Sequence, residues 1–192
     1  MSAENVTPNP DDLAKTLSSA VKKGPPPVHL WNPPFCGDLD IRIARNGLWY
    51  YLGTPIGRMP LVKLFASVLR KDGDDYFLVT PVEKIGITVD DAPFVAVDFE
   101  PAGAGAEQVL TFVTNVEDEA VAGPDHPIRV ERDAETGEPS PYILIRDRLE
   151  ALIDRKSFYR LVDIGVHDDH EGERWFGVKP EVDEDIRRAV LA

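Results

Sequence analysis

The chain has 192 residues, of which 43% are hydrophobic and 29% charged, and its formal net charge is −13. This composition is that of a globular protein with one large domain or two small ones. The charge repels nucleic-acid phosphates and anionic lipid headgroups, and no cluster of Lys and Arg offsets it. No apolar run approaches the roughly 20 residues of a membrane helix. We therefore expect neither nucleic acid nor a membrane as a partner.

The start of the chain and its cysteine content favour a cytoplasmic location. Residues 1–5 include neither a basic stretch nor an apolar one, so no secretory signal is visible. Cys36 is the only cysteine, which excludes a disulfide within the chain. Both observations are typical of a protein in a reducing compartment.

The N-terminal region is predicted to hold a helix and a proline-rich strap. Residues 11–23 have apolar side chains on one helical face, and Gly24 follows as a stop signal. The prolines between 25 and 34 force an extended chain. Trp31 and Phe35 are expected to pin this strap to the body of the protein.

A hairpin is predicted immediately after the strap. Residues 41–45 and 48–52 flank Asn46-Gly47, which is the sequence of a type I′ turn. The three aromatic residues at 49–51 alternate between the two faces of the second strand. The sequence leaves open which face is exposed.

The rest of the chain is predicted to be strand-rich, with a few helices. The apolar stripe of a helix at 60–70 consists of Leu61, Leu64, Phe65, Val68 and Leu69. Asp147 and Glu150 have the spacing of a capping box, which predicts a helix at 147–154. Further helices are predicted at 156–165 and 181–191. The predicted strands are at 76–80, 84–89, 94–99, 108–114, 128–132, 142–145 and 174–178.

Two stretches of the chain repeat each other at an offset of 34 residues. They are Val79-Thr80-Pro81-Val82-Glu83, followed by Asp91 and Pro93, and Val113-Thr114-Asn115-Val116-Glu117, followed by Asp125 and Pro127. An ungapped match of this length indicates a duplicated supersecondary unit. We therefore predict that the two stretches are equivalent strand ends in two similar substructures.

Several motifs are specific enough to indicate a family. They are Asn46-Gly47-x-Trp49, Gly53-Thr54-Pro55-Ile56-x-Arg58, Leu61-Val62-x-Leu64-Phe65, Leu78-Val79-Thr80-Pro81-Val82-Glu83-Lys84, Pro141-Tyr142-Ile143-x-Ile145-Arg146 and Phe158-Tyr159-x-Leu161-Val162. In these motifs the chain resembles a bacterial family, domain of unknown function number 1285. The resemblance covers most of the chain, from about Trp31 to Gly165.

The resemblance implies a duplicated core in two parts. It implies that the C-terminal part is superficially like the pleckstrin-homology fold, a strand-rich unit closed by a helix. It further implies a binding site in the cleft between the parts and a role in signal transduction. No reaction is established for the family, so the resemblance supplies no catalytic residue.

We expect an α+β protein with a duplicated, mainly antiparallel core and a packed helix in each half. The expected parts are a tail, helix and strap at 1–30, an N-terminal part at 31–103, and a C-terminal part at 104–192. The last part includes an acidic tail and the last predicted helix. A Gly/Ala-rich loop at 101–106 marks the expected boundary.

The candidate ligand-binding residues, expected to line the cleft between the parts, are Arg58, Glu83, Lys84, Tyr142 and Arg146. Arg58 and Arg146 are each predicted to head a helix, where backbone amides would help them to bind an anion. The structural alternative is that Glu83 pairs with Arg58 and that Glu117 pairs with Arg146.

No catalytic residue, metal site or cofactor is predicted. The stretch His167-Asp168-Asp169-His170-Glu171-x-Glu173 has side chains that bind metals, but its spacing matches no known framework. We expect it to be a solvated acidic loop. Cys36 has no neighbouring histidine, and the sequence has no nucleophile elbow and no phosphate-binding loop.

The sequence therefore favours a cytoplasmic, non-enzymatic binding or regulatory module whose partner is a small molecule or a protein. Two alternatives remain. One is a small metal-dependent or hydrolytic enzyme that uses the acidic and histidine residues, and the other is a structural subunit of a complex. The ligand, the pathway and the oligomeric state are not specified by the sequence.

Overall fold

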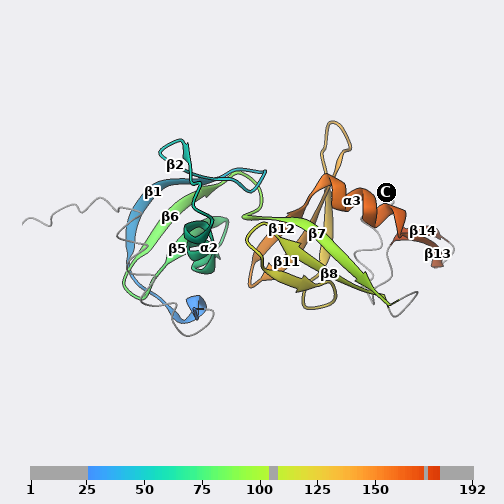
Figure 1. The fold of residues 1–192 in the computed structure, drawn as a ribbon, viewed down its shortest axis with the longest axis horizontal. Helices are drawn as coiled ribbons and strands as arrows, with labels where there is room; N and C mark the ends of the chain where they lie inside the picture. The colour runs from blue at the N-terminus through green and yellow to red at the C-terminus, as the bar shows by residue number, and fades with distance from the viewer. Residues whose placement is uncertain (1–25, 104–107, 171–172, 178–192) are drawn as a thin grey trace, which may run out of the picture. The chain divides into compact units, whose positions relative to one another are not determined.

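The computed structural model describes residues 26–103, 108–170 and 173–177 (Figure 1). These residues form two compact units. Unit 1 comprises the described part of Met1–Ala44 together with Leu48–Asp90, and unit 2 comprises Arg45–Gly47 together with the described part of Asp91–Ala192. The helices predicted at 11–23 and 181–191 lie outside the described residues. No helix in the described part of the chain is long and apolar enough to cross a membrane.

Unit 1 is a six-stranded sheet with one α-helix packed against it (Figure 1). Its strands are β1 (Phe35–Ile43), β2 (Trp49–Tyr51), β3 (Thr54–Pro55), β4 (Leu69–Asp72), β5 (Asp75–Val79) and β6 (Lys84–Val89). Their order in the sheet is β3-β2-β1-β6-β5-β4. The 3₁₀-helix η1 (Val28–Leu30) precedes β1, and α2 (Met59–Ser67) connects β3 to β4.

The core of unit 1 lies between the sheet and α2. Trp49 stacks on Phe65 of α2 with 6.4 Å between the ring centroids, and both side chains are buried. Tyr50 points to the opposite face, where the guanidinium carbon of Arg42 lies 5.9 Å from its ring centroid. Trp49 is therefore the core residue of the aromatic run at 49–51.

The helix predicted at 60–70 is confirmed, but it ends earlier, and of the predicted stripe Phe65, Val68 and Leu69 are buried, the last two beyond the helix. The helix stops at Ser67, and Leu69 already belongs to β4. Leu61 and Leu64 are only half-buried. The buried residues within α2 are Val62, Phe65 and Ala66.

Unit 2 is a second six-stranded sheet, followed by a helix and a small hairpin (Figure 1). Its strands are β7 (Phe94–Ala102), β8 (Val109–Thr114), β9 (Glu119–Val121), β10 (Ile128–Arg132), β11 (Pro139–Arg146) and β12 (Leu149–Ile153), in the order β10-β11-β12-β7-β8-β9. The later elements are α3 (Arg155–Asp163) and the hairpin of β13 (Val166–His170) and β14 (Glu173–Gly177).

The two six-stranded sheets have the same topology. Each consists of two three-stranded antiparallel meanders, and the first strand of the first meander lies parallel to the last strand of the second. This central parallel pair is β1 and β6 in unit 1, and β7 and β12 in unit 2. Only the helix differs in place, because α2 lies between the meanders and α3 follows the second. The duplicated α+β fold expected from the sequence is confirmed.

The helix predicted at 147–154 is wrong, because these residues form a turn and β12. Burial alternates along β12, which is the period of a strand. Asp147 is no helix cap but has a φ of 47° in the turn between β11 and β12. The cap is Asp154, whose Oδ1 accepts the N–H of Ser157 at 2.7 Å. The helix predicted at 156–165 is confirmed as α3.

The hairpin between β1 and β2 is confirmed, but its turn is not of type I′. The N–H of Ala44 donates to the carbonyl of Leu48 at 2.9 Å, so three residues span the loop. Within that loop only Gly47 has a positive φ, of 80°. A Cβ at Gly47 would also lie 2.6 Å from Nδ2 of Asn115, so packing and backbone conformation both require glycine.

The acidic stretch at 167–173 was expected to be a loop, and this expectation is wrong. His167 to His170 belong to β13, which pairs with β14, and β14 corresponds to the strand predicted at 174–178. The side chains of this hairpin lie outside the described part of the structure.

The 34-residue repeat is a repeat of a local turn. Strand β5 ends at Val79 and β8 ends at Thr114, and each is followed by a tight turn into an antiparallel strand. However, β5 belongs to the second meander of its sheet and β8 to the first. The prediction holds for the turn, but the two strands are not equivalent positions of the duplication.

Candidate functional site

The five candidate residues are divided between the two units. Arg58, Glu83 and Lys84 lie in unit 1, whereas Tyr142 and Arg146 lie in unit 2. Their contacts within each unit show what each side chain is used for.

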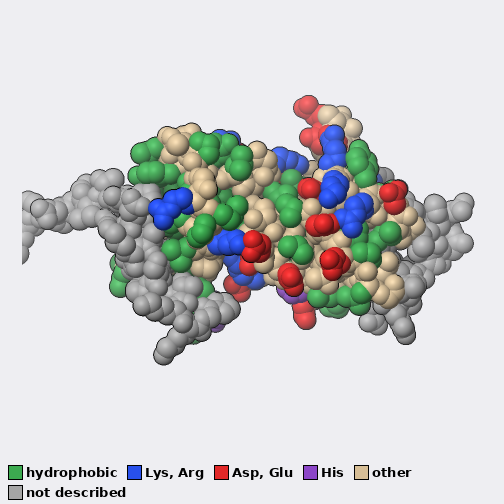
Figure 2. Space-filling model, viewed as in Figure 1, with side chains coloured by type: hydrophobic (Ala, Val, Ile, Leu, Met, Phe, Trp, Pro, Cys, Tyr) green, Lys and Arg blue, Asp and Glu red, His purple; other side chains and the backbone are tan. Residues whose placement is uncertain are grey.

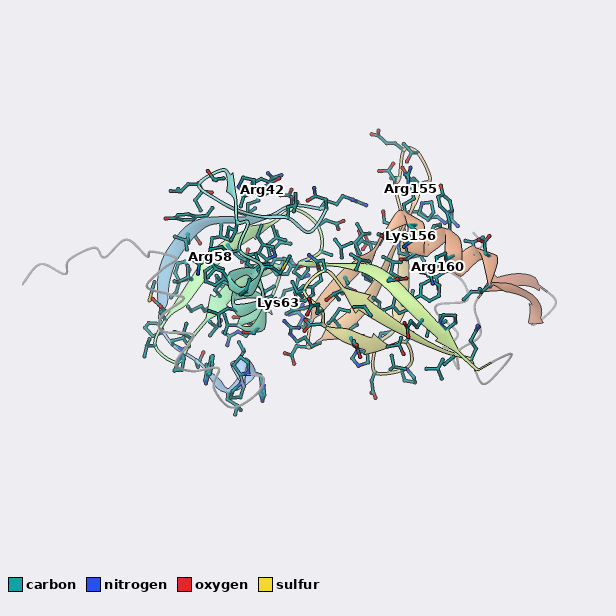
Figure 3. The ribbon with its side chains drawn as sticks, viewed as in Figure 1. Arg42, Arg58, Lys63, Arg155, Lys156 and Arg160 are labelled. Atoms are coloured by element: carbon teal, nitrogen blue, oxygen red, sulfur yellow. The ribbon has the colours of Figure 1, made fainter. Side chains whose placement is uncertain are left out.

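Arg58 and Glu83 do not form the pair that the sequence predicted. Arg58 is exposed at the start of α2 (Figure 3), where its carbonyl accepts the N–H groups of Leu61 and Val62. Glu83 is half-buried in the turn before β6, and burial raises the pKa of its carboxyl. Both residues are within the described range 26–103, and no ion pair joins them.

Lys84 is held by a carboxylate and an aromatic ring on the outer face of the sheet of unit 1. Its Nζ lies 2.6 Å from Oδ2 of Asp72 and 3.8 Å from the ring centroid of Phe77. Arg70 binds the same carboxylate oxygen at 2.8 Å. Burial alone would raise the pKa of Asp72, but the hydrogen bonds from Arg70 and Lys84 outweigh it, so the pKa is lowered.

Arg70 also anchors the strap to the sheet. Its Nη1 donates to the carbonyl oxygen of Trp31 at 2.6 Å and to that of Val28 at 3.3 Å. From the sequence, the side chains of Trp31 and Phe35 were expected to pin the strap. Phe35 is 57% exposed, whereas Trp31 is half-buried and Val28 is buried, so Arg70 holds the backbone of a strap that also packs through side chains.

An exposed apolar surface surrounds the start of β1 in unit 1. The N–H of Lys84 donates to the carbonyl of Pro34 at 3.1 Å, and Phe35 is the strand partner of Lys84. The ring of Phe35 meets the ring of Phe77 edge-on at 6.2 Å. Val82, two residues before Lys84, is 65% exposed. We call this set of Pro34, Phe35, Phe77, Val82 and Lys84 the Phe35 surface.

Tyr142 is the centre of a polar cluster in unit 2. Its hydroxyl donates to Oδ1 of Asp91 at 2.8 Å, and Oδ2 of Asp91 pairs with Arg45 at 3.2 Å. Oδ2 is buried and accepts no hydrogen bond in the described structure, so this ion pair is what compensates its charge. Arg45 also donates to Oγ of Ser140 at 2.8 Å. Each polar group of the cluster thus has a partner within the unit.

The chemistry open to Tyr142 is limited to donating a hydrogen bond. The side chain is buried, and burial together with the hydrogen bond to Asp91 raises its pKa to about 12. The phenol therefore stays protonated at neutral pH and is a poor general base or nucleophile. The guanidinium of Arg129 covers the ring, with its carbon 4.4 Å from the ring centroid.

Arg146 ends β11 and heads no helix, which corrects the sequence prediction. It forms an ion pair with Asp118, and its guanidinium carbon lies 4.9 Å from the ring centroid of Phe94. Asp118 is the residue after Glu117, whose pairing with Arg146 was the structural alternative from the sequence, and Glu117 and Arg146 each make a further contact. Without a helix start beside it, Arg146 has no backbone amides to share with an anion.

The duplication can be followed through the pairing of the strands. In unit 1 a row of cross-strand neighbours runs through Arg70, Phe77, Gly86 and Asp38. In unit 2 the corresponding row runs through Arg129, Tyr142, Leu152 and Val95. Two positions are chemically alike in the two rows, an arginine followed by an aromatic residue.

One position on the outer faces carries opposite charges in the two units. Lys84 lies two residues before Gly86, and Glu150 lies two residues before Leu152, so the two are equivalent. Arg129 binds Glu150 through Nε and Nη2, each at 2.6 Å. Arg70 has a lysine at this place and binds Asp72 and the strap instead. The side chain at this position, Lys84 or Glu150, thus differs in charge between the units, and the partners of Arg70 and Arg129 differ with it.

The described parts of the chain contain no group of three or more His, Cys, Asp or Glu side chains that is arranged to hold a metal ion. Acidic and basic side chains are intermingled over the visible face of unit 2 (Figure 2). Examples are Arg155 with Glu138, and Arg160 with Asp98, from the labelled residues of α3 (Figure 3). At these two positions of α3, each arginine is thus paired with a carboxylate.

Comparison with known families identifies the chain. The model of the N-terminal domain of DUF1285, a domain of unknown function, matches residues 26–92, and the model of the C-terminal domain of DUF1285 matches residues 93–182. The chain belongs to the DUF1285 family. No curated protein matches it.

Solved structures agree with this assignment. A DUF1285 family protein from Silicibacter pomeroyi DSS-3 is 59% identical, with a TM-score of 0.78 over 88% of this chain and 91% of that one. A DUF1285 family protein from Shewanella baltica OS155 is 31% identical, with a TM-score of 0.51 over 65% of this chain and 91% of that one. These matches establish the family, and no function accompanies them.

Sequence reasoning missed the arginines that organise both DUF1285 domains. Arg70 and Arg129 each precede an acidic residue by two positions, Asp72 and Glu131, and each pair is joined by an ion pair. The offset of 59 residues (129 − 70) holds for both members. This pattern of an aliphatic residue, an arginine, any residue and an acid was the available signal, but the more conspicuous 34-residue repeat obscured it.

Proposed function

We propose that this DUF1285 protein is a cytoplasmic, non-enzymatic binding module and that unit 1 engages a protein partner through the Phe35 surface. The observation that carries the proposal is the exposure of Phe35, the strand partner of Lys84, and of Val82, two residues before Lys84, at 57% and 65%. Contiguous exposed apolar side chains with a polar rim are typical of protein-interaction surfaces.

The use of the polar candidates supports a binding role over a catalytic one. Lys84 is paired with Asp72, Arg146 with Asp118, and Tyr142 with Asp91. A catalytic side chain must be able to exchange protons or bonds with a substrate, whereas these groups are committed to contacts within their own units. These three side chains therefore serve their own sheets, whereas Arg58 is exposed and Glu83 is half-buried without an ion pair between them in the described structure.

The apolar part of the Phe35 surface supports a protein partner. Lys84 shares the carboxylate of Asp72 with Arg70, so these three side chains carry one net positive charge beside the exposed rings. Exposed apolar side chains with charge at their rim suit the side chains of another protein better than a small polar metabolite.

The test is a comparison of matched variants. The wild-type chain, the double variant Phe35→Ser/Val82→Ser and the control Val97→Ser/Val109→Ser would be immobilised and exposed to an extract of Silicibacter pomeroyi. The control removes two exposed valines, 38% and 41% accessible, from unit 2. A protein retained by the wild type and the control would then be purified and its dissociation constant measured with all three chains.

We expect the double variant to weaken binding of the purified partner by roughly tenfold or more, since truncation of a central apolar anchor costs over 1 kcal/mol. Equal binding by the three chains would refute the proposed surface. A thermal-shift screen against metabolites tests the small-molecule alternative, because a ligand at about 100 times its dissociation constant adds about 2.7 kcal/mol of stability.

A further inference from the structure

We propose that the free edge of β10 is a self-association surface, on which β10 of a second copy of this chain pairs in antiparallel orientation about a two-fold axis at Val130. This surface lies in unit 2 and is independent of the Phe35 surface. The inference rests on the direction of the backbone groups of β10, on its edge position and on its charge pattern.

The hydrogen-bond phase of β10 follows from its two ends. The N–H of Leu144 donates to the carbonyl of Pro127 at 3.0 Å, and the N–H of Asp133 donates to the carbonyl of Glu138 at 3.0 Å. Hydrogen-bonded residues alternate along an antiparallel strand, so Arg129 and Glu131 direct their backbone groups toward β11. Ile128 and Val130 consequently direct their N–H and C=O groups away from the sheet.

The prolines of β11 agree with this phase. Pro141 is the strand partner of Val130, and Pro139 is the strand partner of Arg132. A proline has no N–H to donate, and at these two positions β10 requires none. The pairing with β11 is therefore complete without the outward groups of Ile128 and Val130, which have no hydrogen-bond partner among the described residues.

Among the edge strands of the two six-stranded sheets, β10 is the one suited to strand addition. In unit 1, β3 is two residues long and contains Pro55, and β4 is in contact with η1. In unit 2 the opposite edge, β9, is only three residues long. Strand β10 has five residues and no proline. Long edges without protection are the usual sites of strand pairing between chains.

The charges of β10 favour its own copy as the occupant. In antiparallel self-pairing about Val130, Arg129 of one copy lies opposite Glu131 of the other, and the reverse pair forms by symmetry. Opposite charges directly across two strands are stabilising, and like charges are destabilising. Arg129 is 42% exposed and Glu131 is 63% exposed, and on self-pairing their ion pair within one copy is shared with the pairs between copies, while Glu150 keeps its two hydrogen bonds from Arg129. A two-fold axis also pairs the outward N–H and C=O of Val130 with those of its copy.

The size of the contact sets its expected strength. Stable interfaces bury about 1,200–2,000 Å², and one pair of five-residue strands buries less than that. We therefore expect reversible dimerisation with a dissociation constant on the order of tens of micromolar or weaker.

The experiment is sedimentation equilibrium of the full chain from about 1 µM to about 1 mM, which brackets the expected range. Val130→Pro removes an outward N–H without removing a bond to β11, and Val121→Pro is its control. Val121 directs its N–H away from β8, because the N–H of Ala122 donates to the carbonyl of Leu110. Glu131→Arg places like charges opposite each other, and Glu135→Arg makes the same charge change in the adjacent exposed loop.

We expect dimers of the wild type and of both controls, and a dissociation constant at least roughly tenfold higher for Val130→Pro and for Glu131→Arg. Glu131→Arg keeps the test decisive if Val130→Pro does not fold. A wild type that stays monomeric over the whole concentration range overturns the proposal. The edge of β10 would then be a site for a strand of another protein. A dimer that Glu131→Arg leaves unchanged also overturns it.

Discussion

Thr80 and Thr114 form the same hydrogen bonds in the two units. Each side chain is buried, and each Oγ1 accepts the N–H of the residue two positions later, at 3.2 Å for Val82 and 3.4 Å for Val116. The second turn is one residue longer, and Glu117 takes a φ of 67° to accommodate it. Glu83 and Asp118 are therefore equivalent in the two turns, because the backbone N–H of each donates to the threonine Oγ1.

Both threonines are expected to stabilise the protein through their hydroxyl groups. Thr80→Val or Thr114→Val removes an acceptor shared by two backbone N–H groups while keeping the shape of the side chain. We expect a loss of about 1–3 kcal/mol in the free energy of unfolding for either variant, measured by urea denaturation. The control is Thr111→Val on β8, where the described structure gives the hydroxyl no hydrogen bond. Losses equal to that of the control would contradict the prediction.

A side chain at Gly86 is expected to displace Asp38. An ideal Cβ at this position would lie 2.0 Å from Oδ1 of Asp38, whose exposed carboxylate can rotate away. Gly86→Ala should therefore cost at most about 1 kcal/mol, and adding Asp38→Ala should remove that cost. Gly57→Ala is the control, since a Cβ there meets nothing within 4 Å. If the double variant is no more stable than Gly86→Ala, the clash is not the cause.

The buried phenol of Tyr142 should make the protein sensitive to alkaline pH. Its pKa is raised to about 12 in the folded chain, above the ordinary value of about 10 for an unfolded chain. Its contribution is therefore complete below about pH 10 and is lost as the pH rises toward about 12, by roughly 3 kcal/mol at most.

The measurement for Tyr142 is the free energy of unfolding across this alkaline range, with phenolate absorbance recorded in parallel. Tyr142→Phe should flatten the decline, whereas Tyr159→Phe, which changes an exposed phenol, should leave it in place. A decline of the same steepness in Tyr142→Phe would refute the assignment.

The ionised carboxylate of Glu83 is expected to destabilise the folded chain because it is half-buried. Burial raises the pKa of this carboxyl, so its contribution to stability is present at low pH and is lost as the pH rises through the folded pKa. Glu83→Gln should therefore stabilise the chain at neutral pH and have little effect at about pH 4. Glu100→Gln, at an exposed position of β7, is the control. A destabilised Glu83→Gln at neutral pH would point to a partner for the carboxylate.

The fold class and most strands could be predicted because local patterns determine them. The alternation around Asn46-Gly47 specifies a hairpin whatever surrounds it. The segment 147–154 was assigned wrongly because Leu149, Leu152 and Ile153 fit a helical stripe, while Leu149, Ala151 and Ile153 fit a strand. Pairing with β11 and β7 selects the strand, and that information is not local.

The site residues were harder to predict because ion pairs depend on the register of distant strands. The pairing of Glu83 with Arg58 was expected because Glu83 recurs in the repeat and Arg58 heads a predicted helix, but the structure shows no ion pair between the two within the described residues. Lys84 and Tyr142 were named as candidates for a ligand cleft, and the structure places each in a polar cluster of its own unit. Their partners, Asp72 and Asp91, are 12 and 51 residues away in the chain.

Equivalent positions of the two sheets differ, with Lys84 in one and Glu150 in the other, and Gly86 in one and Leu152 in the other. These differences affect whether strands of the two units can mispair during folding. Two sheets of the same topology invite β6 and β12 to insert into each other's places during folding. Leu152 in the place of Gly86 would meet Asp38, and Lys84 in the place of Glu150 would face Arg129. The size and charge of these residues thus favour pairing of β6 and of β12 within their own sheets. The divergence of the two copies lowers the risk of misfolding that their shared ancestry creates.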